Sequence, residues 1–250
     1  MKKVLTYIVM LLIGIPISGC DSGGDCFRGA GDRIMEEITV DSFNELFVNE
    51  DIEVVVTQGA QYKVVVETGE RLFDDFKAEV TEGVLTLTME NTCEILRAYN
   101  ETKVWITAPD ITRIVSSTQY AIRSEGILDF NNLSLLSDGF TLEGSVTNGE
   151  FILEVEVDRL SILANELANF EISGRANSLH MNLADGSVRA YMPELYVGYA
   201  NIYHRSSNDV TLFPVDSVRG ELWGTGNLVL VNVPPVIEVK ENYKGKLILD

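Results

Sequence analysis

The stretch Leu160-Ser-Ile162, Ala168-Asn169-Phe170-Glu-Ile172, Leu179-His-Met181 carries the pattern that decides the fold of this chain. A short strand with apolar residues at alternate positions is followed by a turn rich in Gly, Asn or Asp, and then by a second such strand. The pattern recurs from about residue 111 to the C-terminus, and its copies start 16 to 27 residues apart. Further copies of the first strand are Leu133-Ser-Leu135, Leu195-Tyr-Val197, Leu228-Val-Leu230 and Ile237-Glu-Val239. A short repeated unit of this kind is typical of a solenoid, in which each copy buries its apolar face against the next.

The repeat predicts an all-β protein whose alternate apolar residues point inward. These positions are Leu133, Leu135, Phe140, Leu142, Leu160, Ile162, Phe170, Ile172, Val188, Leu195, Val197, Ile202, Leu228 and Leu230. An antiparallel β-sandwich also contains many short strands. We favour the solenoid because the same short motif recurs, whereas a sandwich would show longer alternating hairpins. Between residues 52 and 107 the same alternation predicts further strands.

The first 19 residues have the features of an export signal. Lys2 and Lys3 precede an apolar run that ends at Ser18, which is too short to span a bilayer, where about 20 residues are needed. The run leads into Ile17-Ser18-Gly19-Cys20, which resembles the lipobox of bacterial lipoproteins and implies a lipid on Cys20. The alternative is an ordinary signal peptide with a chance cysteine. We expect a signal peptide at residues 1–19 and a mature protein held at a membrane by its lipid.

A polar, glycine-rich segment follows the signal. We expect residues 20–33 to form a flexible tether and residues 34–250 to form the β domain. If Cys20 is lipidated, Cys26 and Cys93 remain, and an even pair in an oxidising compartment predicts a disulfide. That bridge would stabilise the fold by roughly 4 kcal/mol in the chain-entropy description. The alternative is two free thiols.

The chain is strongly acidic, with a formal net charge of −19. Loss of the signal peptide removes Lys2 and Lys3 and no acid, which moves the charge to −21. A surface of this charge repels phosphate backbones, so we expect no nucleic-acid partner. Neutral and cationic ligands remain open.

Several segments of the domain are similar to those of a known family. They are Val54-Val-Val-Thr-Gln-Gly59, Tyr62-Lys-Val-Val-Val-Glu67, Val80-Thr-Glu-Gly-Val-Leu-Thr-Leu87, Val104-Trp-Ile-Thr-Ala-Pro109, Trp223-Gly-Thr-Gly-Asn-Leu228 and Gly245-Lys-Leu-Ile-Leu249. Over residues 34 to 250 the chain thus resembles the "putative auto-transporter adhesin, head GIN domain" family, which is typical of Bacteroidota envelope lipoproteins. The resemblance implies a right-handed parallel β-helix, a single-stranded β-solenoid, in the cell envelope. It brings no catalytic motif with it.

The sequence contains no recognisable catalytic constellation. Of its two histidines, His180 is expected to point outward by alternation, and His204 is expected in the core or at a corner. No motif places a nucleophile, a base and an orienting acid together, and the cysteines have no zinc-site spacing to either histidine. We therefore expect a non-enzyme without a cofactor.

The run Glu154-Val-Glu156-Val-Asp158 is the most pointed acidic feature. Period two places the three carboxylates on one outward face of a strand. They could form a weak calcium site, because this ion takes six to eight oxygen ligands. The alternative is a solvated strand face, which we favour because no short loop rich in Asp and Asn accompanies the run.

Outward aromatic residues suggest a ligand surface at Tyr191, Tyr196 and Tyr203. A tyrosine ring can stack on a sugar or anchor a protein partner. The alternative is that these rings cover a loop or a neighbouring strand.

These features favour a lipid-anchored, non-catalytic protein of the cell envelope. We expect it at the outer membrane, facing the periplasm or the outside, where its β surface binds a glycan or protein ligand in adhesion. The alternative is a lyase or hydrolase that acts on polysaccharides, because parallel β-helices also carry such sites. A third hypothesis is an assembly role through the edge of a terminal strand.

Overall fold

The computed structural model describes residues 30–90, 102–139 and 146–250, and apart from one short 3-10 turn the regular structure in these ranges is all β. The N-terminal elements are β1 (Arg33–Ile38), β2 (Glu45–Val48), β3 (Ile52–Gln58), β4 (Lys63–Gly69), the 3-10 turn η2 (Phe73–Asp75), β5 (Phe76–Thr81), β6 (Val84–Met89), β7 (Thr102–Ala108), β8 (Arg113–Ser116) and β9 (Ala121–Leu128). The C-terminal elements are β10 (Asn132–Ser137), β11 (Glu150–Ala164), β12 (Asn169–Leu183), β13 (Arg189–His204), β14 (Val210–Leu222), β15 (Leu228–Leu230), β16 (Val236–Glu241) and β17 (Leu247–Leu249).

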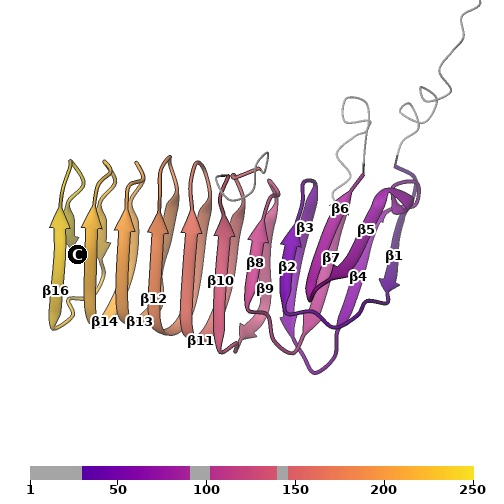
Figure 1. Ribbon diagram of the computed structural model, residues 1–250, viewed down its shortest axis with the longest axis horizontal. Helices are drawn as coiled ribbons and strands as arrows, with labels where there is room; N and C mark the ends of the chain where they lie inside the picture. The colour runs from indigo at the N-terminus through magenta and orange to yellow at the C-terminus, as the bar shows by residue number, and fades with distance from the viewer. Residues whose placement is uncertain (1–29, 91–101, 140–145) are drawn as a thin grey trace, which may run out of the picture.

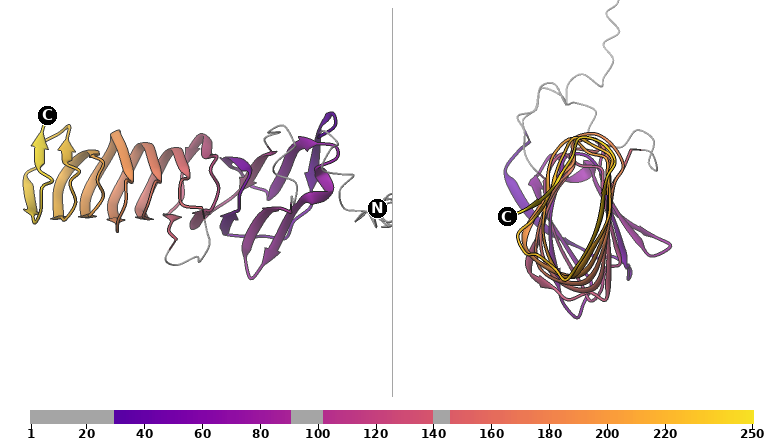
Figure 2. Two further views of the ribbon diagram at one scale, coloured as in Figure 1. Left: turned by 90° about the horizontal axis from the view of Figure 1, so that it is seen from above. Right: turned by 90° about the vertical axis from the view of Figure 1, so that its left-hand side faces the viewer.

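These strands form one 17-stranded mixed sheet, which curls around a single core into a nearly closed, flattened barrel (Figures 1 and 2). In the described ranges β1 pairs antiparallel with β4, β4 with β7, and β5 with β6. The prediction of a right-handed parallel β-helix, a single-stranded solenoid over residues 34–250, is therefore wrong.

The N-terminal chain departs from that prediction because it turns back on itself. Strand β4 lies antiparallel between β1 and β7. Strand β5 joins β6 through Glu82 and Gly83, whose φ angles are +53° and +81°. Two successive residues with positive φ match the twist of a two-residue hairpin turn, so the local sequence favours an antiparallel pair here.

From β8 to β17 every pairing among the described strands is parallel. Strands β11 to β14 are 13 to 16 residues long, and each curves around the core before the chain rises to the next. Seen end-on, these coils superpose on one another (Figure 2). Seen from the side, they follow each other along the long axis, with β1 and β16 near opposite ends (Figure 1).

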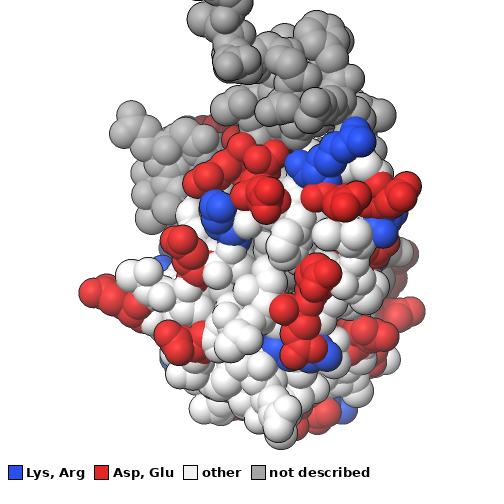
Figure 3. All heavy atoms as spheres, turned by 90° about the vertical axis from the view of Figure 1, so that its right-hand side faces the viewer, with Lys and Arg blue, Asp and Glu red and all other residues white. Residues whose placement is uncertain are grey.

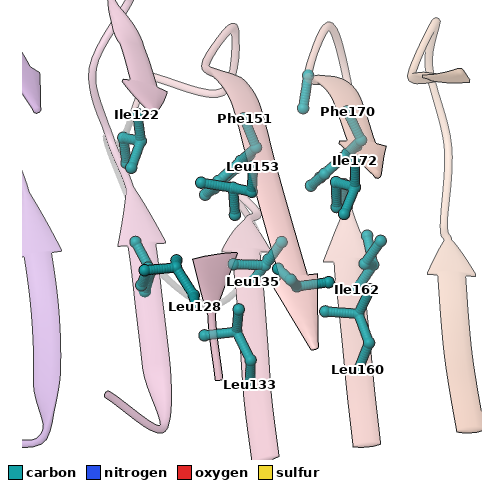
Figure 4. Packing of buried hydrophobic residues seen from close by; sticks show 14 of the residues in the cluster. Ile122, Leu128, Leu133, Leu135, Phe151, Leu153, Leu160, Ile162, Phe170 and Ile172 are labelled. Carbon is teal, nitrogen blue, oxygen red and sulfur yellow. The ribbon is translucent and has the colours of Figure 1, made fainter. Parts of the chain in front are cut away.

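Inward side chains of successive coils line up into ladders that fill the core. One ladder runs through Ile122, Phe151, Phe170, Ala190 and Val210, and the two Phe rings stack with their centroids 5.0 Å apart. Figure 4 shows members of this and a neighbouring ladder packed between adjacent strands. All of the predicted inward residues that the structure describes are buried, whereas Phe140 and Leu142 lie outside the described residues.

The register of one predicted copy differs from the structure. Leu195-Tyr-Val197 lies opposite Gly174 to Ala176, and the true partner of Leu179-His-Met181 is Ala200-Asn-Ile202. A register shift between Glu171 and Gly174 separates the two parts of the strand pair. Because Ala200 is small, the segment Ala200-Asn-Ile202 is less apolar than Leu195-Tyr-Val197. The sequence pattern therefore favoured Leu195-Tyr-Val197 as the repeat copy.

The coils approach each other so closely at several points that only glycine fits, and Gly174 is one of them. Gly174 has a φ of +103°, and a Cβ at this position would lie 2.1 Å from the carbonyl oxygen of Val155 in the preceding coil. Both the backbone conformation and the contact exclude a side chain. Gly174 therefore marks the bend at which β12 changes direction around the core.

Candidate ligand-binding surface

The predicted tyrosines lie outward on β13, as alternation requires. Tyr191, Tyr196 and Tyr203 are between 38% and 46% exposed. Tyr199, which the sequence analysis did not single out, is 55% exposed on the same strand. Ala200 lies opposite the buried Leu179 and therefore points inward, so its neighbour Tyr199 points outward. Recognising this register in the sequence would have identified Tyr199.

The tyrosines do not share one face, because β13 bends around the core. The pairing of β13 with β14 shifts between Met192 and Tyr196 and again between Val197 and Tyr199. As a result, Tyr191, Tyr196 and Tyr203 line three different surface hollows.

The hollow beside Tyr191 has a volume of about 420 Å³ and an acidic lining. Glu154, Glu171 and Glu194 surround it. The guanidinium of Arg189 lies 5.6 Å from the centre of the Tyr191 ring, so a cation already occupies one side of this aromatic residue.

The hollow beside Tyr203 measures about 580 Å³ and is lined by paired charges. Lys240 contacts Glu221 at 3.4 Å, and Arg219 contacts Glu238 at 3.0 Å. Because these groups satisfy each other, they offer little to a ligand.

The third hollow, about 460 Å³, lies beside Tyr196 on the outer side of β11 to β14, and we call it the Tyr196 hollow. Its polar lining consists of Asp129, Asn131, Glu156, Asp158, Arg175, Asn177 and Asp216. Parallel pairing creates this arrangement, because Glu156, Arg175 and Tyr196 stand opposite one another in three successive coils. The structure thus brings Glu156 and Asp158 of the predicted acidic run together with one of the predicted tyrosines.

Most polar groups of the Tyr196 hollow are available to a ligand. The side-chain amide of Asn177 donates a hydrogen bond to Asp158 Oδ1 at 3.0 Å. Within the described ranges, Arg175 has no carboxylate at ion-pair distance, although four acids line the same hollow. An unpaired guanidinium offers five N–H donors, and the carboxylates offer only acceptors.

The Tyr196 ring is held by a second aromatic side chain. Its centroid lies 4.7 Å from that of Phe213 in the next coil, and the rings meet edge to face at 61°. An edge-to-face pair is a favourable arrangement, worth about 0.5–1.5 kcal/mol beyond its buried area. Tyr196 is therefore positioned before any ligand arrives.

The predicted calcium ligands are divided between two hollows. Glu154 lines the hollow of Tyr191, whereas Glu156 and Asp158 line that of Tyr196. Among the residues that the structure describes, no group of three or more His, Cys, Asp or Glu side chains is close enough to hold a metal ion. The metal site stays a prediction, without a preformed set of ligands to support it.

The two histidines lie in different environments. His180 is exposed and stands between Ser161 and Asn201 of the adjoining coils. His204 is fully buried between Leu183 and Leu222, and among the described residues no group forms a well-aligned hydrogen bond with either ring nitrogen. Burial lowers the pKa of His204, and nearby Asp209 and backbone groups oppose that shift only in part.

Acidic side chains also dominate the end of the molecule that carries β1. Figure 3 shows Asp and Glu over much of that face, with fewer Lys and Arg between them. Three predicted residues, Cys20, Cys26 and Cys93, lie outside the described residues. In the part of the chain that is described, no helix is long and apolar enough to cross a membrane.

Sequence reasoning found Glu156 and Tyr196 separately but missed the residues that join them. Arg175 and Asn177 follow the repeat copy that ends at Ile172. When Leu160 is aligned with Leu179, Arg175 falls opposite Glu156 and Asn177 falls opposite Asp158. Asp129 follows the end of β9, and Asp216 lies within β14 where the register shifts, so no repeat position could have identified them.

Comparisons with known proteins agree on the family. The sequence profile of the "Putative auto-transporter adhesin, head GIN domain" family matches residues 42–234. No curated protein matches the chain.

Solved structures with a similar fold include two putative adhesins and a putative lipid binding protein. A putative adhesin from Bacteroides fragilis is 15% identical with a TM-score of 0.78, and the match covers 89% of this chain and 100% of that one. A putative lipid binding protein from Parabacteroides distasonis is 14% identical with a TM-score of 0.62, covering 87% of this chain and 97% of the other. A putative adhesin from Parabacteroides merdae is 15% identical with a TM-score of 0.58, covering 89% and 98%. At this level of identity the likeness concerns the fold alone.

Proposed function

Because the chain belongs to the "putative auto-transporter adhesin, head GIN domain" family, we propose that it is a non-catalytic binding protein of the cell envelope that recognises its ligand through the outer surface of β11 to β14. The observation that carries this proposal is the group of exposed tyrosines Tyr191, Tyr196 and Tyr199 on β13. Exposed Tyr side chains are costly to leave in water and are enriched at recognition surfaces, where they lose little conformational freedom on binding. Here they stand on strands whose inward neighbours are tightly packed, so the surface is stiff.

The placement of the histidines leaves a polysaccharide lyase without a histidine base, whereas a hydrolase would need a pair of carboxylates instead. His204 is enclosed by Leu183 and Leu222, and a substrate could not reach its ring. His180 lies on an exposed strand position beside Ser161 and Asn201, without a carboxylate partner among its neighbours in the sheet. A general base needs a substrate within hydrogen-bond reach and an orienting group, and neither histidine has both.

The test of this function is an array of immobilised glycans and extracellular-matrix proteins, probed with the full chain purified in detergent. We expect retention on a defined subset of spots, and retention should fall when Tyr191, Tyr196 and Tyr199 are replaced together by serine. Turnover of polysaccharide into shorter products in the same samples would favour the enzyme. Absence of retention on every spot would contradict the proposed function.

We further propose that Cys20 carries the lipid that holds the protein at the outer membrane, with the signal peptide removed and residues 20–33 acting as a tether. The lipobox-like ending Ile17 to Cys20 supports it. Growth with radioactive palmitate should label the wild-type chain and leave Cys20→Ala unlabelled. Equal labelling of both would rule out this anchor.

Cys26 and Cys93 are proposed as a disulfide in the exported protein. Alkylation before and after reduction, followed by intact-mass measurement, should reveal two additional alkylated thiols only after reduction. If both thiols react without reductant, the bridge does not exist.

A further inference from the structure

We propose that the Tyr196 hollow is a saccharide site, which takes one ring of a neutral, polyhydroxylated ligand between Tyr196 and the polar side chains of β11 and β12. This inference rests on the proposed function and assigns the site and the chemical class of the ligand. Three observations carry it, namely an exposed aromatic platform, a mixed set of donors and acceptors, and the contrast with the two other hollows.

The platform consists of apolar side chains on one side of the hollow. Tyr196 is 44% exposed and is fixed by the edge-to-face contact with Phe213. Val215, also exposed, lines the same hollow. The face of an aromatic ring is electron-rich, and it attracts the weakly positive C–H groups on the flat side of a sugar ring.

The opposite side of the hollow carries both donors and acceptors. Arg175 can donate through its unpaired guanidinium, and Glu156 and Asp158 can accept. Asn177 is oriented by its own hydrogen bond to Asp158 Oδ1 and still has a carbonyl oxygen for a ligand. A sugar hydroxyl donates and accepts at once, so a mixed lining of this kind can satisfy several hydroxyls in fixed positions.

The central position of Arg175 decides against a purely cationic ligand. Asp129, Glu156, Asp158 and Asp216 would attract a cation, but Arg175 stands among them in the row between Glu156 and Tyr196. A second positive charge placed over the tyrosine would meet that guanidinium. A neutral polyol makes use of both signs.

The coil that carries Tyr196 packs closely on the coil below it at Gly198. A Cβ on Gly198 would lie 2.6 Å from the carbonyl oxygen of Asn177. Gly198 also lines the hollow, so this close contact fixes the height of Tyr196 above Asn177.

The other two hollows lack this combination. Beside Tyr191, the lining has three glutamates, and Arg189 already approaches the ring. Beside Tyr203, Lys240 and Arg219 are paired with Glu221 and Glu238. Tyr203 thus provides a matched control, since it is an exposed tyrosine of the same strand in a hollow whose charges are satisfied.

The experiment measures binding of the full chain in detergent to three probe sets on one array, which are neutral oligosaccharides, amino-sugar oligosaccharides with oligolysine, and matrix proteins. The best neutral oligosaccharide is then titrated by calorimetry against wild type, Tyr196→Ala, Arg175→Ala and Tyr203→Ala. We expect Tyr196→Ala to weaken binding about tenfold or more and Arg175→Ala to weaken it severalfold. Tyr203→Ala should stay within about twofold of wild type. Unchanged circular dichroism and melting of Tyr196→Ala would exclude a folding defect.

Three results would overturn the saccharide site, and they separate it from the proposed function. Retention only on amino-sugar or oligolysine spots would mean that the acids alone attract the ligand. Binding of a neutral oligosaccharide that Tyr203→Ala abolishes and Tyr196→Ala leaves intact would move the site elsewhere. Retention only on matrix proteins would contradict the saccharide site but would support the proposed binding function. Failure on all three probe sets would remove both.

Discussion

The strands before β8 and the coils after β9 enclose the same core by different means. In the N-terminal part, β4 lies antiparallel between β1 and β7, and β5 forms a local hairpin with β6. In the C-terminal part, each coil pairs in parallel with the one before it, and most partners lie 18 to 21 residues apart in sequence. The difference shows that the described coils of the parallel part contain no hairpin of their own. The stability of each coil therefore depends on its pairing with the neighbouring coils.

The proposed recognition surface lies entirely in the parallel part. Glu156, Arg175 and Tyr196 meet because three coils repeat the same register. Exposed charges pair across neighbouring strands in both parts, as Arg33 does with Glu67 and Arg219 with Glu238. The comparison therefore predicts that substitutions in the coils affect both folding and binding, whereas those in the N-terminal part affect folding locally.

The largest expected effect comes from removing one ring of the stacked pair. Phe170→Ala should lower the free energy of unfolding by about 3–5 kcal/mol, because the fully buried ring leaves a cavity beside Phe151. Hydrogen exchange should accelerate first in β11, β12 and β13, whose coils share that ladder. Phe43→Ala, a control in the N-terminal part, should leave exchange in these strands slower than Phe170→Ala does. Equal acceleration by both variants would show that the two parts unfold as one unit.

The next effect tests the close approach of the coils. Gly174→Ala should cost about 2–4 kcal/mol, because the new Cβ would meet the Val155 carbonyl and the backbone has a φ that L-residues rarely adopt. The control is Gly126→Ala, which has a φ of +80° and no atom within 4 Å of the added Cβ. It should cost only about 1 kcal/mol, from backbone strain alone. Urea denaturation of both variants measures the difference, and equal losses would mean that the contact with Val155 relaxes freely.

A pH-dependent effect is expected in the parallel part, at His204. Burial holds the pKa of His204 below its unfolded value of 6.5, so the unfolded chain takes up a proton before the folded one does. The stability contribution is complete above about pH 6.5 and is lost as the pH falls toward the folded pKa. His204→Leu, which places a leucine between Leu183 and Leu222, should flatten the fall in melting temperature between about pH 6.5 and pH 5. An identical pH profile for wild type and variant would mean that the ring titrates without restraint in the fold.

The smallest effect is expected from an exposed ion pair of the N-terminal part. Lys63 on β4 contacts Glu37 on β1 at 2.9 Å, and both side chains are largely in solvent. Lys63→Ala should change the free energy of unfolding by only about 0.5 kcal/mol, and added salt should remove that difference. A loss above about 2 kcal/mol would indicate that β1 is fastened mainly by this pair.

The sequence predicted the core better than the course of the chain. Residues such as Leu160 and Phe170 lie in segments where apolar residues alternate with polar ones, and this alternation is enough to predict that they are buried. Val54 and Val64 are equally buried, yet their alternation is the same in a parallel and an antiparallel strand. The direction of β4 is decided by its pairing with β1 and β7, which are distant in sequence and leave no local signal.

The candidate site was predictable only in pieces. Tyr196 and Glu156 were identified as outward residues, because alternation within a strand is local. Their meeting depends on the register between coils, which shifts by one residue after Glu171 and by three after Met192. In the sequence Arg175 is a single arginine outside any motif, so it was not predicted as a site residue. Its position between Glu156 and Tyr196 gives the Tyr196 hollow hydrogen-bond donors as well as acceptors.

The stacking of coils also fixes a length. Each parallel coil adds one strand spacing, about 4.8 Å, along the axis that separates β1 from β16 (Figure 1). If the chain is tethered beside β1, insertion or deletion of one coil would move the far end relative to the membrane without altering the row geometry of the remaining coils. Reach and recognition can then vary independently, since one depends on how many coils there are and the other on which side chains face outward.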